Sequence, residues 1–261
     1  MHTSHSFDGE TGMEDMLRAA IAAGITVTAI TDHAEMNEYV HGGFDAAIEA
    51  SFAEASALAQ KYSPQLRVAC GVEMGQATQD FSAAEAMLAK HRFDFVLGSL
   101  HNLADETDFY FWDYDAMSDT EIHGKIQDYF NELTALVKWG RFHSLAHLTY
   151  PFRFIPPERG LAGCGPWMDS VDEILRLLAQ KGIALEINAG GLRSKIGETL
   201  PGTALLKRFR ELGGEYITLG ADAHKPADIG YGIDKGAAAA RAAGFRHCAV
   251  YFGGTPEMMN L

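Results

Sequence analysis

Short apolar runs rich in β-branched residues alternate along the chain with longer stretches in which apolar positions recur every three or four residues. This alternation is typical of successive β/α units and predicts a parallel sheet. We expect strands at Thr26–Thr31, Leu66–Glu73, Phe93–Leu100, Phe142–His147, Ile183–Asn188, Tyr216–Ala221 and Cys248–Phe252. Because no internal repeat and no Pro-, Gly- or Ser-rich linker divides the 261 residues, we expect one barrel-like α/β domain over residues 1–261.

Two of the intervening helices carry N-terminal signals. Thr11 with Glu14 three residues later predicts a capping box, and Gly24 predicts the end of that helix. Ser118 with Glu121 predicts a second capping box. The helix that follows has an apolar stripe that we expect in the core: Ile122, Ile126, Phe130, Leu133 and Val137.

Composition narrows the class of partner. The formal net charge of −14 repels a polyanion and no Lys/Arg run offsets it, so nucleic acid is not expected as a partner. No apolar stretch is long enough to span a membrane and the first residues lack a signal-peptide pattern, so we expect a cytoplasmic protein without membrane contact. Three widely spaced cysteines, Cys70, Cys164 and Cys248, predict neither a disulfide framework nor a thiolate zinc site.

Residues able to bind metal ions fall at the carboxyl ends of the predicted strands. They are His33, Glu73, His101, His147, Asp222 and His224. The carboxyl ends of parallel strands meet on one face, so these side chains are expected to become neighbours. Asp222 and His224 are two residues apart and project to the same side if their strand continues that far. Imidazole and carboxylate are ligands of Zn, Fe and Mn, and the set exceeds what one ion needs, so a multinuclear site is predicted.

Short words along the chain resemble the PHP (polymerase and histidinol phosphatase) family, most closely its histidinol-phosphatase branch. They occur in the family's order: His2-Thr3 followed by Ser6-Phe7-Asp8-Gly9, then Thr31-Asp32-His33, Gly71-Val72-Glu73, Gly98-Ser99-Leu100-His101, Ala146-His147-Leu148, Glu186-Ile187-Asn188 and Ala221-Asp222-Ala223-His224. The resemblance implies a distorted (β/α)7 barrel with a site for two or three divalent metal ions.

Carried over position by position, the resemblance implies three groups of ligands. His2, Glu73 and Asp222 would hold one ion; Glu73 would bridge to a second ion held by His101 and His147; and Asp8, His33 and His224 would hold a third. Asp32 would orient a ligand by hydrogen bonding. For Asp8 a second interpretation stands beside this one, because Asp-Gly is also an ordinary turn sequence.

The chain departs from the family pattern at its first strand. The family opens with His-x-His, and if His2 is the second of these histidines, the first falls immediately before Met1. The resemblance therefore implies a truncated first strand and leaves open whether the first ion binds and whether the site is active. The spacing of His5 from His2 does not match that of the absent histidine, so we do not expect His5 to replace it.

The activity implied is hydrolysis of a phosphate monoester in which Glu73 and Asp222 take catalytic roles. Divalent ions lower the pKa of bound water from 15.7 towards about 7 and neutralise charge on the phosphoryl oxygens, and Asp222 would accept or relay the proton. Arg153 and Arg193 follow strand ends and are expected to bind the phosphate, because guanidinium donates in a bidentate fork. Two longer loops, Asn102–Asp119 and Phe154–Pro166, are expected at the active-site face.

The first choice of substrate is histidinol phosphate, which places the protein in histidine biosynthesis. Another small phosphorylated substrate, such as a nucleotide, a sugar phosphate or phosphotyrosine, keeps the same metals. A third alternative is a degenerate metal-binding domain without catalytic activity. The sequence leaves open the metal (zinc, manganese or iron) and the oligomeric state.

Overall fold

The structure of the protein is a computed structural model that describes residues 1–159, 161 and 163–261; within the predicted loop Phe154–Pro166, residues 160 and 162 lie outside this description. Its α-helices are α1 (Met13–Ala22), α2 (Phe44–Tyr62), α3 (Phe81–Lys90), α4 (Asp119–Trp139), α5 (Met168–Lys181), α6 (Thr203–Glu211) and α7 (Ile233–Ala242). Its strands are β1 (Val27–Ile30), β2 (His33–Glu35), β3 (Arg67–Gly75), β4 (Phe95–Ser99), β5 (Ser144–Leu145), β6 (Ala184–Asn188), β7 (Ile217–Gly220), β8 (His247–Phe252) and β9 (Thr255–Asn260). Short 3₁₀ turns join them: η1 (Met36–Glu38), η2 (Ala77–Gln79), η3 (Phe109–Phe111), η4 (Tyr150–Arg153), η5 (Pro157–Arg159), η6 (Gly165–Trp167), η7 (Ala189–Arg193) and η8 (Pro226–Asp228).

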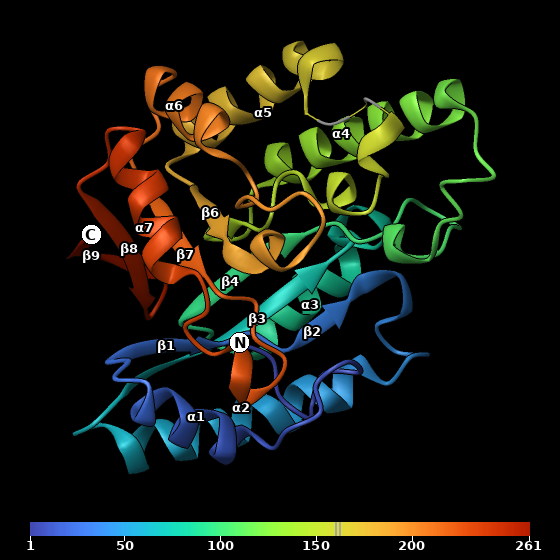
Figure 1. Ribbon diagram of the computed structural model, residues 1–261. Helices are drawn as coiled ribbons and strands as arrows, with labels where there is room; N and C mark the ends of the chain where they lie inside the picture. Colours follow the sequence, from blue (N-terminus) through green and yellow to red (C-terminus); the bar gives the residue numbers. More distant parts are fainter. Residues whose placement is uncertain (160, 162) are drawn as a thin grey trace.

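Seven strands form one parallel sheet in the order β1-β3-β4-β5-β6-β7, with β2 also paired to β3. The sheet curls into a half-barrel, with α1 and α2 along one side and α4 to α6 along the other (Figure 1). Among the described residues β1 and β7 do not pair, so the barrel is open between them. All seven predicted strands form, and the parallel β/α architecture is confirmed.

The last predicted strand, β8, forms outside the parallel sheet. It pairs antiparallel with β9, and only Gly253 and Gly254 separate the two strands. Both glycines have positive φ, 57° and 73°, which is the backbone that a two-residue hairpin turn requires. The sequence Gly-Gly therefore turns the chain back on itself from β8 into β9.

The first two residues lie in the opening between the edge strands. The Met1 amine donates to Ala29 O at 3.0 Å, Thr31 N donates to Met1 O at 3.0 Å, and His2 N donates to Ala223 O at 2.9 Å. Residues 1 and 2 thus bridge the end of β1 to the segment after β7, and this contact fixes the backbone of His2. A cavity of about 670 Å³ extends from there between β1 and β7.

The helix predictions are confirmed at one N-terminus and wrong at the other. The Ser118–Glu121 capping box forms, and the whole predicted stripe of α4 is buried. At α1 the N-cap is Gly12, without a side-chain cap, because the Glu14 carboxylate is engaged instead by Arg18 and Lys61. Gly24 follows the end of α1 with φ 75°, as expected of a stop signal.

No helix among residues 1–159, 161 and 163–261 has both the length and the apolar character needed to cross a lipid bilayer. Cys70, Cys164 and Cys248 are all free.

Candidate metal centre

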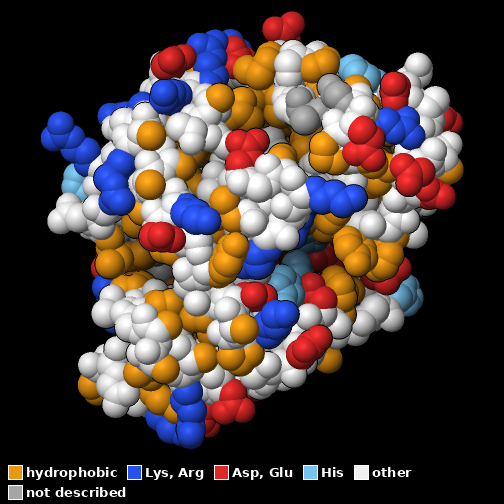
Figure 2. Space-filling model, in the orientation of Figure 1, with side chains coloured by type: hydrophobic (Ala, Val, Ile, Leu, Met, Phe, Trp, Pro, Cys, Tyr) orange, Lys and Arg blue, Asp and Glu red, His pale blue; other side chains and the backbone are white. Residues whose placement is uncertain are grey.

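A pocket of about 390 Å³ opens where the carboxyl ends of the parallel strands meet. It is lined by seven of the eight predicted metal ligands and by both predicted phosphate-binding arginines: Asp8, His33, Glu73, His101, His147, Asp222, His224, Arg153 and Arg193. The eighth ligand, His2, is 2% exposed and lies behind them. Figure 2 shows histidine side chains at the bottom of a hollow whose rim carries charged side chains. The structure therefore brings together the complete set of residues named from the sequence.

Glu73, in the long strand β3, lies at the centre of this cluster. Its Oε1 atom is 3.0 Å from His101 Nε2 and 3.1 Å from His147 Nε2. Its Oε2 atom is 3.4 Å from His2 Nε2, which also lies 3.3 Å from Asp222 Oδ1. The two oxygens of one carboxylate thus face two different sets of imidazoles, which is the arrangement that a bridging ligand requires.

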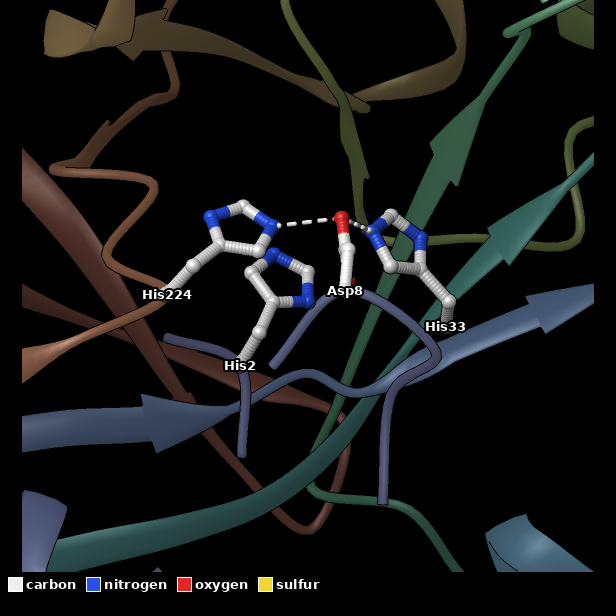
Figure 3. A group of neighbouring side chains, drawn as sticks. All are labelled: His2, Asp8, His33 and His224. Atoms are coloured by element: carbon white, nitrogen blue, oxygen red, sulfur yellow. Dashed lines mark ion pairs between the residues drawn. The ribbon is translucent and has the colours of Figure 1, made fainter. Parts of the chain in front are cut away.

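A second group of side chains lies beside the first and is shown in Figure 3. Asp8 Oδ2 is 2.9 Å from His224 Nε2 and 3.6 Å from His33 Nε2. The His2 ring stacks between the other two imidazoles, with centroids 4.4 Å from His33 and 4.2 Å from His224. Residues around Asp8 do form a turn, closed by Gly9 N donating to Ser6 O, and this turn carries the Asp8 carboxylate into the cluster.

Asp222 and His147 both have strained backbones. Their φ angles are 53° and 26°, in the left-handed region that side-chain-bearing residues avoid. Such strain costs about 1–3 kcal/mol and persists only where the surroundings enforce it. Here Glu186 accepts a hydrogen bond from His147 N at 2.9 Å, and Arg193 donates to the backbone oxygen of Asp222 at 2.7 Å. The strand does not continue to His224, so Asp222 and His224 reach different partners.

Burial and neighbouring charges shift the pKa values of the side chains in the cluster. Burial alone would lower the pKa of His101, but Glu35 and Glu73 outweigh it and raise that pKa to about 10. Burial opposes ionisation of Glu73 as well, yet the surrounding imidazoles, His33 first, hold the pKa of its carboxyl well below the usual value. His2 is the exception, because burial and the neighbouring His33 lower its pKa to about 4. Carboxylates here are thus stabilised by protonated imidazoles.

Divalent cations fit this donor set. Within residues 1–159, 161 and 163–261, three groups of side chains have ligand atoms within 4.8 Å of one another: His2, Asp8, His33 and His224; His33, Glu35 and His101; and Glu73, His101 and His147. Ligands bound tetrahedrally at about 2.1 Å lie about 3.4 Å apart. The nitrogen–oxygen contacts described above span 2.9 to 3.6 Å, as expected where cations take the place of the protons on the imidazoles.

Asp32 supports the N-terminal segment. Its carboxylate accepts hydrogen bonds from Thr3 N at 2.6 Å, from Ser6 Oγ at 2.9 Å and from Ser51 Oγ at 2.6 Å. Ser6 Oγ lies in turn 3.5 Å from His2 Nδ1. Asp32 therefore reaches the imidazole of His2 through Ser6 and not directly. His5 turns away from the cluster and contacts Glu54 at 2.7 Å.

Sequence reasoning assigned no role to two buried acids at the site. Glu35 lies 3.1 Å from His33 Nδ1 and 3.2 Å from His101 Nδ1, and these imidazoles outweigh burial and lower its pKa to about 2. Glu186, on β6, has its pKa raised to about 8 by burial and by the charge of Glu73. The available signals were the alternation His33-x-Glu35 and an acid within an otherwise apolar strand.

The two arginines differ in what their guanidinium groups already bind. Arg153 Nε is buried and has no hydrogen-bond partner in the part of the chain that the structure describes, and Nη1 lies 3.9 Å from Asp222 Oδ2. Arg193 is exposed and donates to the backbone oxygens of Ala221 and Asp222. Arg153 therefore faces the pocket with free donors, whereas Arg193 is partly engaged in holding the turn after β7.

Aromatic side chains and one carboxylate line the other half of the pocket. Tyr110 and Phe111, 63% and 71% exposed, belong to the predicted loop Asn102–Asp119. Phe154 lies beside them, 5.5 Å from the Tyr110 ring. The hydroxyl of Tyr150 donates to Asp108 at 3.1 Å. The pocket thus has a basic side near the ligand cluster and an acidic, aromatic side at the loop.

Comparison with known proteins agrees with this geometry. The model of the PHP domain family matches residues 1–190. A protein of Clostridium acetobutylicum named "Probable histidinol-phosphatase" is 30% identical over 233 residues, which cover 88% of this chain and 87% of that protein. A histidinol-phosphatase of Lactococcus lactis subsp. lactis is 27% identical over 97% of this chain and 93% of that protein. The crystal structure of histidinol phosphate phosphatase from L. lactis, complexed with zinc, L-histidinol and phosphate, superposes with a TM-score of 0.84 at 26% identity, covering 98% of this chain and 97% of that one. The chain belongs to the PHP domain family.

Proposed function

We propose that the protein is a cytoplasmic, metal-dependent phosphomonoesterase whose substrate is histidinol phosphate, and that residues 1–261 act as one catalytic domain. The observation that carries the proposal is the position of Glu73, whose two carboxylate oxygens face His2 on one side and His101 with His147 on the other. The names of the C. acetobutylicum and L. lactis relatives support the choice of substrate.

The ligand groups would hold two or three ions of zinc, iron or manganese. Zinc is supported by the related L. lactis structure, which contains it. When bound, such ions activate water as a nucleophile and neutralise negative charge on a phosphoryl group. His2, Glu73 and Asp222 would form the first group, and Glu73, His101 and His147 the second. Asp8, His33 and His224 would form the third.

Asp222 and the two arginines would act on the substrate. The Asp222 carboxylate lies in the pocket lining, where it would accept a proton from the attacking water. Arg153 would bind the phosphoryl oxygens, because its Nε–H lacks a partner and its guanidinium is within 3.9 Å of Asp222. Arg193 would bind the same group from the exposed side. A charged donor of this kind also disperses the charge that develops as the ester bond breaks.

The other half of the pocket supports an alcohol that carries a ring and a cation. Tyr110, Phe111 and Phe154 offer aromatic surface, and the Asp108 carboxylate beside them accepts hydrogen bonds from Tyr110 N and from the Tyr150 hydroxyl. Histidinol phosphate has an imidazole and an ammonium group, so it matches both features. A sugar phosphate has neither a ring of this kind nor a positive charge.

The test is a comparison of phosphate release from histidinol phosphate, a nucleoside monophosphate, a sugar phosphate and phosphotyrosine, with zinc, manganese or iron supplied. We expect kcat/KM for histidinol phosphate to exceed the others by at least tenfold. A consistent preference for another ester would replace the substrate while keeping the reaction. If no ester is hydrolysed with any of the metals, the enzyme proposal is wrong.

A metal-binding domain without catalytic activity is the alternative. It predicts that the ligand groups take up divalent ions while no ester is hydrolysed. Elemental analysis of the protein, run beside the same panel of esters, tests this alternative. Bound metal without phosphate release would favour it, and phosphate release would reject it.

A further inference from the structure

Glu35 lies between two of the predicted ligand groups. One group contains His101 and the other contains His33, and Glu35 contacts both histidines. The Glu35 side chain is 10% exposed. Its Oε1 atom lies 3.2 Å from Nδ1 of His101, which faces Glu73 and His147 through its other nitrogen. The same Oε1 atom lies 3.1 Å from Nδ1 of His33, whose other nitrogen faces Asp8.

Strand β2 and its pairing with β3 place Glu35 at this position. His33 and Glu35 are alternate residues of β2, so their side chains project from the same face of the strand. In the register with β3, His33 lies opposite Glu73 and Glu35 lies opposite Gly75. A Cβ atom at Gly75 would overlap the Glu35 carboxylate, so the absence of a side chain there makes room for it.

A carboxylate at Nδ1 determines which nitrogen of an imidazole is available to a metal ion. It accepts a hydrogen bond from Nδ1–H, which keeps the proton on Nδ1, directs the Nε2 lone pair to the opposite side and makes Nε2 more basic. For His101 the contact has hydrogen-bond geometry. For His33 the contact is close but not aligned: Glu35 Oε1 lies 3.1 Å from Nδ1, which has no hydrogen-bond partner among the described residues.

We propose that Glu35 is a positioning residue that directs Nε2 of both His33 and His101 at the metal centre and thereby couples two metal positions. This role rests on the metal centre of the proposed function. The competing interpretation, in which Glu35 itself binds an ion together with the two Nδ1 atoms, requires each imidazole to bridge two ions. The geometry does not favour it, because both Nε2 atoms already face carboxylates at 3.0 and 3.6 Å.

The test measures metal affinity and not only activity. Zn²⁺ dissociation constants of the protein would be determined by competition with chelators, and Co²⁺ absorption spectra would report the ligand field at each position. We expect Glu35→Ala to weaken two positions together, each by about 10- to 100-fold, as is typical when the hydrogen-bond partner of a ligand is removed. Glu35→Gln keeps an acceptor oxygen and should lose less than Glu35→Ala.

Two further variants separate the role of the carboxylate from folding. Gly75→Ala leaves Glu35 in the chain but displaces its carboxylate, so it should weaken the same two positions. Glu38→Gln, an exposed acid three residues further on, removes the same charge and should bind metal like the wild type. Circular dichroism and thermal unfolding of the metal-free variants check that each one folds.

Three results would overturn this role. The first is an unchanged Zn²⁺ affinity in both Glu35→Ala and Gly75→Ala, and the second is a weaker affinity at only one metal position. The third is complete loss of one ion from Glu35→Ala while the other ions bind as before, which would make Glu35 itself a ligand. A wild-type protein that binds metal but hydrolyses no ester would reject the proposed function and leave the Glu35 measurement intact. A wild-type protein that takes up no divalent ion would refute both.

Discussion

Glu186 provides a quantitative test of the electrostatics of the site. It is 5% exposed, and one oxygen accepts hydrogen bonds from His147 N at 2.9 Å and from Asn188 Nδ2 at 3.2 Å. Gly220 leaves room for the other oxygen, because a Cβ atom there would overlap it. Burial, followed by the charge of Glu73, raises the pKa of Glu186 from 4.5 to about 8 in the metal-free protein. The native state therefore holds a proton that the unfolded chain has lost.

The sign of the pH effect follows from this difference. Between pH 4.5 and about 8 the native state binds more protons than the unfolded state, so the free energy of unfolding falls as the pH rises. One pH unit corresponds to about 1.4 kcal/mol, which gives an upper bound of about 5 kcal/mol over the whole interval. Relaxation of the protein around the charge reduces this bound to a few kcal/mol. Glu186→Gln removes the effect because an amide does not ionise.

The assay is urea unfolding of the metal-free protein at pH 5 and pH 8. We expect Glu186→Gln to match the wild type within about 1 kcal/mol at pH 5 and to be more stable by about 2–4 kcal/mol at pH 8. Glu215→Gln, an exposed acid, is the control and should show no such difference. Added Zn²⁺ should shrink the effect at pH 8, because cations beside Glu73 favour the ionised form of Glu186. An identical stability difference at both pH values would refute the reasoning.

Three further predictions concern metal and substrate. His101→Ala should lower zinc content and kcat together, since it removes a ligand and not a substrate contact; elemental analysis beside kinetics checks this. Arg153→Ala should raise KM and the inhibition constant of inorganic phosphate by about 10- to 100-fold, because a hydrogen bond to a charged group is worth about 1.5–3 kcal/mol. Arg193→Ala should weaken phosphate binding and leave the metal content unchanged. Unaltered kinetics in either arginine variant would remove that residue from the site. Zinc uptake at pH 7 should release protons and tighten as the pH rises, because the pKa of His101 is raised to about 10 and its imidazole must be neutral to bind; titration calorimetry in buffers of different ionisation enthalpy measures the release.

The sequence by itself determined the scaffold and which residues meet. Apolar runs of strand length, separated by helical periodicity, specify parallel β/α units. In such a sheet every strand delivers its carboxyl end to the same face, so a residue just beyond a strand is placed without knowledge of its partners. From this rule we predicted that Glu73, His101, His147 and Asp222, which are spread over 150 positions of the sequence, lie together, and all four line one pocket.

Only the tertiary structure decided which atoms face each other. The three-residue strand β2 is too short for its periodicity to be recognised, so the contacts of Glu35 with His33 and His101 became visible only once β2 was paired with β3. Likewise Asp222 has a positive φ, and its Oδ1 atom lies 3.3 Å from His2 Nε2 and 3.8 Å from His224 Nδ1. Hydrogen bonds from Arg193 to the backbone oxygen of Asp222 and from His2 N to that of Ala223 hold this turn, and both come from residues far away in the sequence.

The same division explains the errors. The capping box expected at Thr11 did not form, since Lys61, 47 residues away from Glu14, binds its carboxylate instead. Helix and strand patterns follow from backbone periodicity and can be recognised from the order of residues along the chain. Contacts between residues far apart depend on how the sheet curls and on which side chains reach its open end, and these are properties of the folded molecule alone.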